Sequence, residues 1–121
     1  MPIVDIEWVC QPDEQAVISA RALADALGQA LGSPAGRTWV RLHRLDAADY
    51  AENDSTPSAG QLPVFVTLLH SRLPAGSALL AEVSAITDTV ARCLARPADR
   101  VHVQYAPAAA GRQAFGGRLV E

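Results

Sequence analysis

The chain has 121 residues, of which half are apolar and 19% are charged, and this composition predicts one folded domain spanning 1–121. It excludes an extended disordered chain and leaves no room for two ordinary domains. Ten basic and thirteen acidic residues give a formal net charge of −3, without the basic excess typical of nucleic-acid-binding proteins. We therefore expect no nucleic acid as a partner.

The cysteines and the first residues bear on location. Cys10 and Cys93 are isolated and form no C-x-x-C motif, so a reducing cytoplasm is the expected location. Asp5 and Glu7 stand where a signal peptide would be basic and then apolar, and no apolar run reaches the roughly 18 residues of a membrane span. We expect a soluble protein that is not exported and has no membrane partner.

The first half of the chain predicts a βαβ unit. Side chains alternate over Ile3–Cys10, which predicts a strand whose even-numbered residues form an apolar face. After Pro12, which suits the first turn of a helix, a helical stripe runs from Val17 to Leu31 and ends at Gly32. Alternation returns over 38–45, and a connection through a helix favours a strand parallel to the first.

The same order of signals returns in the second half. An apolar run over Val64–Leu69 predicts a third strand, a stripe over Leu79–Leu94 predicts a helix capped by Ser77, and Val101–Tyr105 predicts a fourth strand. Leu62-Pro63-Val64 repeats the pattern of Met1-Pro2-Ile3. We therefore expect two βαβ pseudo-repeats, at about 1–45 and 62–106.

Two such units predict an α+β fold, in which a four-stranded mixed sheet has both helices on one face. The other face would be apolar and uncovered, which predicts self-association. Residues 46–61 are rich in Asp, Ser, Pro and Gly and predict a loop with a short turn near Tyr50. The paired glycines at 116–117 predict a tight turn before a short C-terminal strand, which we expect to cover a neighbouring subunit.

Pro2 has the most unusual chemistry in the chain. Cellular aminopeptidases usually remove Met1 when the next residue is small, and removal would leave a secondary amine at the head of a strand. A free α-amino group titrates near ~8, and burial in an apolar pocket disfavours its charged form, so this amine can act as a base at neutral pH. Pro63 cannot act as a base, because its nitrogen is in a peptide bond. Taken alone, Met-Pro also fits a proline that merely begins a strand.

Pro2 before a strand, the tandem βαβ units, the Pro-x-x-Arg turns at 34–37 and 97–100 and the closing Phe-Gly-Gly at 115–117 resemble the tautomerase superfamily. The resemblance covers essentially the whole chain. It implies a trimeric tautomerase-like fold, with a free Pro2 amine as the catalytic base or acid. It also implies a small-molecule carboxylate substrate and no cofactor.

The resemblance suggests further site residues. The strand containing Arg41 resembles a Val-Arg-Val strand of 4-oxalocrotonate tautomerases, whose arginine holds a carboxylate or polarises a substrate oxygen. Arg72 follows the third strand, where the family commonly places arginines for substrate carboxylates, and its guanidinium can bind an anion through two bonds. His102 and Gln104 occupy the Tyr and Asn positions of an Arg-Val-Tyr-Ile-Asn strand in macrophage migration inhibitory factor, where both line the site.

The match has departures. His102 replaces a phenol, and Ser33 stands in place of a site lysine, for which Arg37 is an alternative cation. Tyr50 is a candidate wall or hydrogen-bond donor of the site, and Glu52 is a candidate water activator in the manner of the chloroacrylate dehalogenases. Each candidate also fits a structural role, as a solvated strand or turn residue.

The leading hypothesis is an isomerase for enol–keto proton transfer on a 2-hydroxy-dienoate or 2-oxo acid. Neutral Pro2 would move the proton while Arg41 and Arg72 hold the carboxylate. One alternative is a decarboxylase, hydratase or dehalogenase of a small unsaturated acid with cationic Pro2 as the acid. Another is a non-catalytic oligomer on the same scaffold. The three histidines lack metal-ligand spacing, so we expect no metal.

Overall fold

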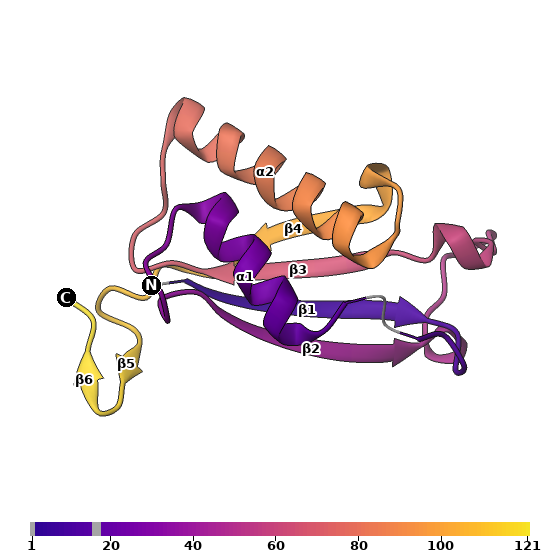
Figure 1. The fold of residues 1–121 in the computed structure, drawn as a ribbon, viewed down its shortest axis with the longest axis horizontal. Coiled ribbons are helices and arrows are strands. Elements are labelled where there is room, and N and C mark those ends of the chain that lie inside the picture. Colours follow the sequence, from indigo (N-terminus) through magenta and orange to yellow (C-terminus); the bar gives the residue numbers. More distant parts are fainter. Residues whose placement is uncertain (1, 16–17) are drawn as a thin grey trace.

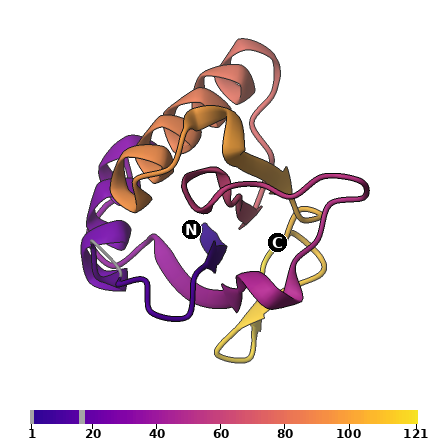
Figure 2. The same cartoon turned by 90° about the vertical axis from the view of Figure 1, so that its right-hand side faces the viewer.

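The computed structural model describes residues 2–15 and 18–121. Four strands form one sheet in the order β2-β1-β3-β4, with the bounds β1 (Ile3–Cys10), β2 (Trp39–Asp46), β3 (Val64–Leu69) and β4 (Val101–Tyr105). β2 is parallel to β1, β4 is parallel to β3, and the central strands β1 and β3 are antiparallel (Figure 1). The helices α1 (Ala20–Leu31) and α2 (Gly76–Leu94) cover the same face of the sheet (Figure 2). The predicted mixed sheet with both helices on one face is confirmed.

The core lies between this sheet and the helices, and β1 supplies its centre. Val4, Ile6 and Trp8 point toward the helices and are buried, because side chains alternate along a strand. They belong to one apolar cluster with buried residues of both helices, namely Leu23, Leu27, Ile86, Val90, Cys93 and Leu94. Burial of each large apolar side chain stabilises the fold by roughly 1.5–3 kcal/mol.

The open face of the sheet, which no helix covers, is not the apolar surface expected from the sequence. The strand register places two mixed rows across it, Arg41–Asp5–Thr67–Gln104 and His43–Glu7–Phe65–His102. The expectation was wrong because the alternation that buries one side of β1 also turns its two acidic residues to the other side. Polar side chains therefore run across the middle of this face.

Helix α1 begins later than the sequence suggested. Val17, part of the expected stripe, lies outside the described residues, and Pro12 lies in a turn. The helix begins after Ser19, whose hydroxyl accepts a hydrogen bond from the Ala22 N–H at 3.1 Å. Gly32 ends it with a φ of 64°, in the left-handed region where glycine is favoured.

The remaining segments are short. α2 begins at Gly76, so the expected cap Ser77 lies within the helix. The loop between the units contains the 3₁₀ turns Ala47–Asp49 and Ala59–Gln61, and a third, Ala98–Arg100, precedes β4. No helix in the described part of the chain has the length and apolar character needed to cross a membrane.

A C-terminal hairpin projects beyond one end of the sheet, near the N-terminus (Figure 1). It consists of β5 (Ala114–Phe115) and β6 (Arg118–Leu119), which are antiparallel. Gly116 and Gly117 have φ angles of 58° and 85°, as the central residues of a two-residue turn with positive φ require. The predicted tight turn is confirmed.

Candidate functional site

Pro2 is buried at the head of the central strand β1. Its carbonyl oxygen accepts a hydrogen bond from the Trp39 N–H at 3.1 Å, which ties the start of the chain to β2. The last residue pair between β1 and β3 joins Ile3 and Leu69. Pro2 therefore lies at the end of the sheet where β3 finishes and the segment after β3 begins.

A cavity of about 340 Å³ opens at this end of the sheet. Ile3 and Arg41 line it from the strands, and the C-terminal hairpin contributes Phe115. The rings of Trp39 and Phe115 meet edge to face with their centroids 5.5 Å apart, so the hairpin forms one wall. This cavity offers apolar surface and one guanidinium close to the start of β1.

Arg41 is already paired in the folded chain. Its Nε donates to Asp5 Oδ1 at 2.5 Å and its Nη2 donates to Asp5 Oδ2 at 2.8 Å. This two-point contact raises the pKa of Arg41 above its ordinary value, although the side chain is 62% exposed. A substrate carboxylate at Arg41 would therefore compete with Asp5.

Arg72 lies beyond β3, at the same end of the sheet as Pro2. The Ser71 carbonyl accepts a hydrogen bond from the Ala110 N–H at 3.1 Å, which holds this segment against the C-terminal region. The Arg72 guanidinium is exposed and donates from Nη2 to the backbone carbonyl oxygen of Glu121 at 3.1 Å. A substrate carboxylate at Arg72 would therefore share the guanidinium with this oxygen of Glu121.

Tyr50, His102 and Gln104 gather elsewhere, on the open face. Tyr50 and Gln104 line a second cavity of about 420 Å³. Phe65 lies between Tyr50 and His102, with ring centroids 6.0 Å from the first and 5.5 Å from the second. Gln104 donates from Nε2 to Thr67 Oγ1 at 2.9 Å. The structure thus brings these three predicted residues into one group.

This group does not join Pro2 within one chain. Gln104 is in register with Thr67 and, through it, with Asp5, so it lies two strands across and three residues along from Pro2. Strand geometry makes this separation about 14 Å. The two side chains also point to opposite faces of the sheet. A small molecule that contacts Pro2 therefore does not reach Gln104 of the same chain.

Glu52 is held by two donors in the loop beside the open face. The Tyr50 hydroxyl donates to Glu52 Oε2 at 2.6 Å, and the Arg100 guanidinium donates to the same oxygen. These two bonds hold the pKa of Glu52 below its ordinary value, and burial and the bond to Glu52 raise the pKa of Tyr50. Such a carboxylate is a weak base, which does not favour its activating a water molecule.

The two candidates from the turn before β2 have separate surroundings. The Ser33 hydroxyl accepts a hydrogen bond from Thr38 Oγ1 at 2.6 Å. Arg37 is exposed, and its N–H donates to the Pro34 carbonyl at 3.1 Å within the turn. Arg37 thus lies two residues before Trp39, the residue that bonds Pro2.

The three histidines lie apart. His43 and His102 occupy the two edge strands, whereas His70 follows β3 and contacts a residue of α2. Among residues 2–15 and 18–121, no three His, Cys, Asp or Glu side chains gather in a way that could hold a metal ion.

A polar cluster around Glu82 was not predicted. His70 Nε2 and Glu82 Oε2 are 2.9 Å apart, and the Tyr105 hydroxyl donates to the same oxygen at 2.7 Å. Burial, followed by the bond to Glu82, raises the pKa of Tyr105 well above its ordinary value. One signal was available in the sequence, because Glu82 lies one helical turn before Ile86 in the apolar stripe of α2. An acidic residue in such a stripe indicates a buried polar contact.

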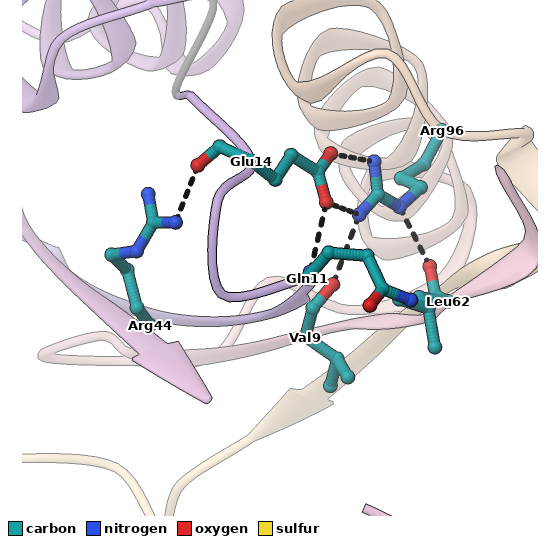
Figure 3. A network of polar contacts seen from close by, with 6 residues as sticks. All are labelled: Val9, Gln11, Glu14, Arg44, Leu62 and Arg96. Carbon is teal, nitrogen blue, oxygen red and sulfur yellow. Dashed lines mark hydrogen bonds and ion pairs between the residues drawn. The ribbon is translucent and has the colours of Figure 1, made fainter. Parts of the chain in front are cut away.

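Arg96 forms the other network that sequence patterns did not reveal (Figure 3). Its side chain is 3% exposed, and it donates to the carbonyl oxygens of Leu62 at 2.9 Å and Val9 at 3.0 Å. It also pairs with both carboxylate oxygens of Glu14, at 2.8 and 3.0 Å. The guanidinium of Arg96 lies over the Trp8 ring, 5.7 Å from its centroid. Arg96 thus joins the end of β1 to the start of β3 and has a structural role.

Comparison with solved structures finds proteins of one fold. Macrophage migration inhibitory factor from Oncomelania hupensis is 20% identical over 100% of this chain and 83% of its own, with a TM-score of 0.73. The Q0 fused 4-OT, solved as a wild-type symmetric trimer, is 19% identical over 98% of this chain and 94% of its own, with a TM-score of 0.68. FG41 malonate semialdehyde decarboxylase, inhibited by 3-bromopropiolate, is 20% identical over 94% of this chain and 90% of its own, with a TM-score of 0.63.

These three proteins are members of the tautomerase superfamily. No protein-family model matches the sequence, and a comparison with curated proteins finds no match. At identities of 16–20%, the likeness concerns the fold, and it extends over nearly the whole chain. The mixed sheet, the two helices on one face and the C-terminal hairpin show that the chain has the fold of the tautomerase superfamily.

Proposed function

We propose that the protein is a cofactor-independent tautomerase or isomerase that uses the free amine of Pro2 as a general base. The observation that carries the proposal is the burial of Pro2 at the head of β1, at the same end of the sheet as Arg72. A cavity lined by Ile3 and Arg41 opens at this end on the other face of the sheet. Burial favours the neutral form of an amine, and a cation at the same end of the sheet favours it further. The tautomerase fold supports this choice of activity.

The substrate would be a small carboxylate-bearing molecule, either a 2-hydroxy-dienoate or a 2-oxo acid. Pro2 takes a proton from the enol hydroxyl or from the acidic carbon and returns it at the other position. Arg72 binds the carboxylate. Arg41 lies with Gln104 on the open face, so its guanidinium, shared with Asp5, would stabilise the developing enolate oxygen of a substrate held at Pro2 of a neighbouring subunit. A positioned general base contributes about 10²- to 10⁴-fold to such a reaction.

The working form would be a homo-oligomer, and a trimer fits best, since a similar fused 4-OT was solved as a symmetric trimer. Tyr50, His102 and Gln104 lie too far from Pro2 to serve the same substrate within one chain. In an oligomer they can complete the site of a neighbouring subunit, with Gln104 as a hydrogen-bond donor and Tyr50 and His102 as its wall.

A decarboxylase is the second candidate, because one similar structure is malonate semialdehyde decarboxylase. In that reaction a protonated Pro2 would act as the acid. Hydration or dehalogenation also needs a carboxylate that activates water, and the two donors on Glu52 make it poorly suited. A pH profile that rises as Pro2 loses its proton favours the tautomerase, and one that falls favours the decarboxylase.

The test begins with the intact mass of the purified protein, which shows whether Met1 has been removed. The protein and its Pro2→Ala variant are then assayed on 2-hydroxymuconate, phenylenolpyruvate and 3-haloacrylates. We expect activity on an enol substrate and a loss of at least about 100-fold in kcat for the variant. Full activity of the variant, or retention of Met1 on the active protein, would contradict the proposal. Retained Met1 together with no activity would favour a non-catalytic oligomer.

A further inference from the structure

His70, Glu82 and Tyr105 form a cluster, here called the Glu82 cluster, between the sheet and α2. His70 Nε2 and the Tyr105 hydroxyl both bond to one oxygen, Glu82 Oε2, at 2.9 Å and 2.7 Å respectively. The rings of His70 and Tyr105 stack at 18° with centroids 6.0 Å apart. The side chains of His70 and Glu82 are each 14% exposed, so solvent screens the carboxylate only partly.

The strand register brings this cluster to Pro2. Val9 donates to the Pro63 carbonyl at 3.2 Å, so odd-numbered residues of β1 form the hydrogen-bonded pairs with β3. Extending this register one step beyond its last pair, Ile3 and Leu69, places Pro2 opposite His70, in a position of the type without hydrogen bonds. Such pairs have Cα atoms about 4.5 Å apart and side chains in close contact.

Both side chains also point to the same side. Val4 and Leu68, which pair with each other, lie two residues from Pro2 and His70 along their strands, and both are buried beneath the helices. Because strand side chains alternate, Pro2 and His70 project to this side as well. His70 is therefore the side chain that joins the surroundings of Pro2 to the Glu82 carboxylate.

We propose that the Glu82 cluster sets the proton affinity of the Pro2 nitrogen, with Glu82 and His70 as positioning residues. The Glu82 charge favours a protonated amine, and the two donors on Oε2 offset that charge. His70 also fixes the wall against which the Pro2 ring packs. The inference rests on the proposed function only in requiring a free amine at Pro2.

Other charged groups surround the Pro2 end of the sheet, and the cluster acts against this constant background. Arg41 of β2 is bound to Asp5 of β1 on the opposite face, and Arg72 is bound to the backbone oxygen of Glu121. Further charged groups on neighbouring elements include Arg37 before β2, Arg21 and Asp25 of α1, Asp88 and Arg92 of α2, Arg112 and Arg118 near the hairpin, and Glu121. None of these groups bonds to Glu82 within the described residues.

The test is an NMR titration of the Pro2 nitrogen and its neighbouring carbons in protein labelled with ¹³C,¹⁵N-proline. Glu82→Gln removes the charge and should lower the midpoint of the Pro2 titration by about half to one pH unit. His70→Ala and Tyr105→Phe each remove a donor from the charged carboxylate and should raise it. Asp88→Asn, which removes an exposed carboxylate from the same helix, is the matched control and should leave it unchanged.

Opposite shifts in Glu82→Gln and His70→Ala are the signature of this coupling, because a general loosening of the fold would move both variants in one direction. His70→Gln, which keeps a donor, should restore most of the wild-type midpoint. Equal midpoints in Glu82→Gln and Asp88→Asn would overturn the inference, and so would shifts of the same sign in Glu82→Gln and His70→Ala. If one variant fails to fold, the other two still decide the sign.

The titration separates this inference from the proposed function. Unchanged midpoints together with an inactive Pro2→Ala variant would refute the inference and leave the proposed function standing. The predicted shifts together with an active Pro2→Ala variant would support the inference and refute the proposed function. Where both hold, the acid limb of the kcat/KM profile should move with the NMR midpoint in each variant.

Discussion

Glu14 supplies the carboxylate that compensates the buried charge of Arg96. Removing one partner of such a pair leaves an uncompensated buried charge, which typically costs about 3–5 kcal/mol. Arg96 retains two backbone acceptors, so we expect Glu14→Gln to lower the free energy of unfolding by about 2–3 kcal/mol at neutral pH. Denaturant unfolding measures this, with the exposed neighbour Asp13→Asn as a control that should change little.

The same contact predicts how stability depends on pH. The hydrogen bond from Arg96 holds the pKa of Glu14 below its ordinary value of 4.5, so the folded state binds this proton less readily than the unfolded state. The stabilisation is present above pH 4.5 and is lost as the pH falls through the folded-state value. Glu14→Gln should remove this part of the acid dependence. Parallel acid curves for the wild type and the variant would show that Glu14 is not its source.

Single residues with distinctive chemistry could be predicted from the sequence, but the residues that they contact were harder to predict. Pro2 and Arg72 were chosen from their positions relative to strands, and the structure places both at one end of the sheet. Glu14 and Arg96, by contrast, are 82 residues apart, and Glu82 meets His70 across 12 residues. Contacts of this kind depend on how helices pack on the sheet, which a local pattern does not encode.

Helix α1 depends on Ser19 for its start. The Ser19 hydroxyl satisfies the Ala22 N–H, one of the helix N–H groups without an intrahelical acceptor. We expect Ser19→Ala to lower the free energy of unfolding by about 1 kcal/mol. Thermal or denaturant unfolding measures the change, and Ser84→Ala on the exposed side of α2 is the control. If both substitutions have the same effect, the cap does not stabilise the helix.

Strands were easier to predict than helix ends. Side-chain alternation marks β1 and an apolar run marks β3, and the predicted bounds of β1, β3 and β4 are those of the structure. Pro12 suggested an early helix start, but the segment after it turns so that Glu14 can reach Arg96. A tertiary ion pair thus decided a boundary that local signals placed elsewhere.

The whole assembly is needed if Tyr50, His102 and Gln104 act on a substrate bound at Pro2. We expect the His102→Ala/Gln104→Ala double variant to be impaired and the Pro2→Ala variant to be inactive. Unfolding the two together and refolding them would then restore activity, because some sites combine an intact Pro2 with an intact strand from another subunit. For random trimers, about a quarter of the sites are complete.

Each variant refolded alone is the control for this mixing experiment, because it contains no complete site. Activity of the mixture no greater than the sum of the two controls would show that all site residues come from one chain. Size measurement of the mixture checks that oligomers have formed. The outcome also distinguishes a shared site from a structural role of His102 and Gln104, since a structural defect in one subunit is not repaired by its neighbour.

The polar rows on the open face have a consequence for any copy that packs against it. Carboxylates, guanidinium groups and imidazoles cannot be enclosed without hydration or partners of opposite charge. An interface between subunits that is built from such faces would contain ordered water molecules between the polar side chains. Subunit association through this surface should therefore weaken with added salt and with acid, in contrast to association through an apolar interface.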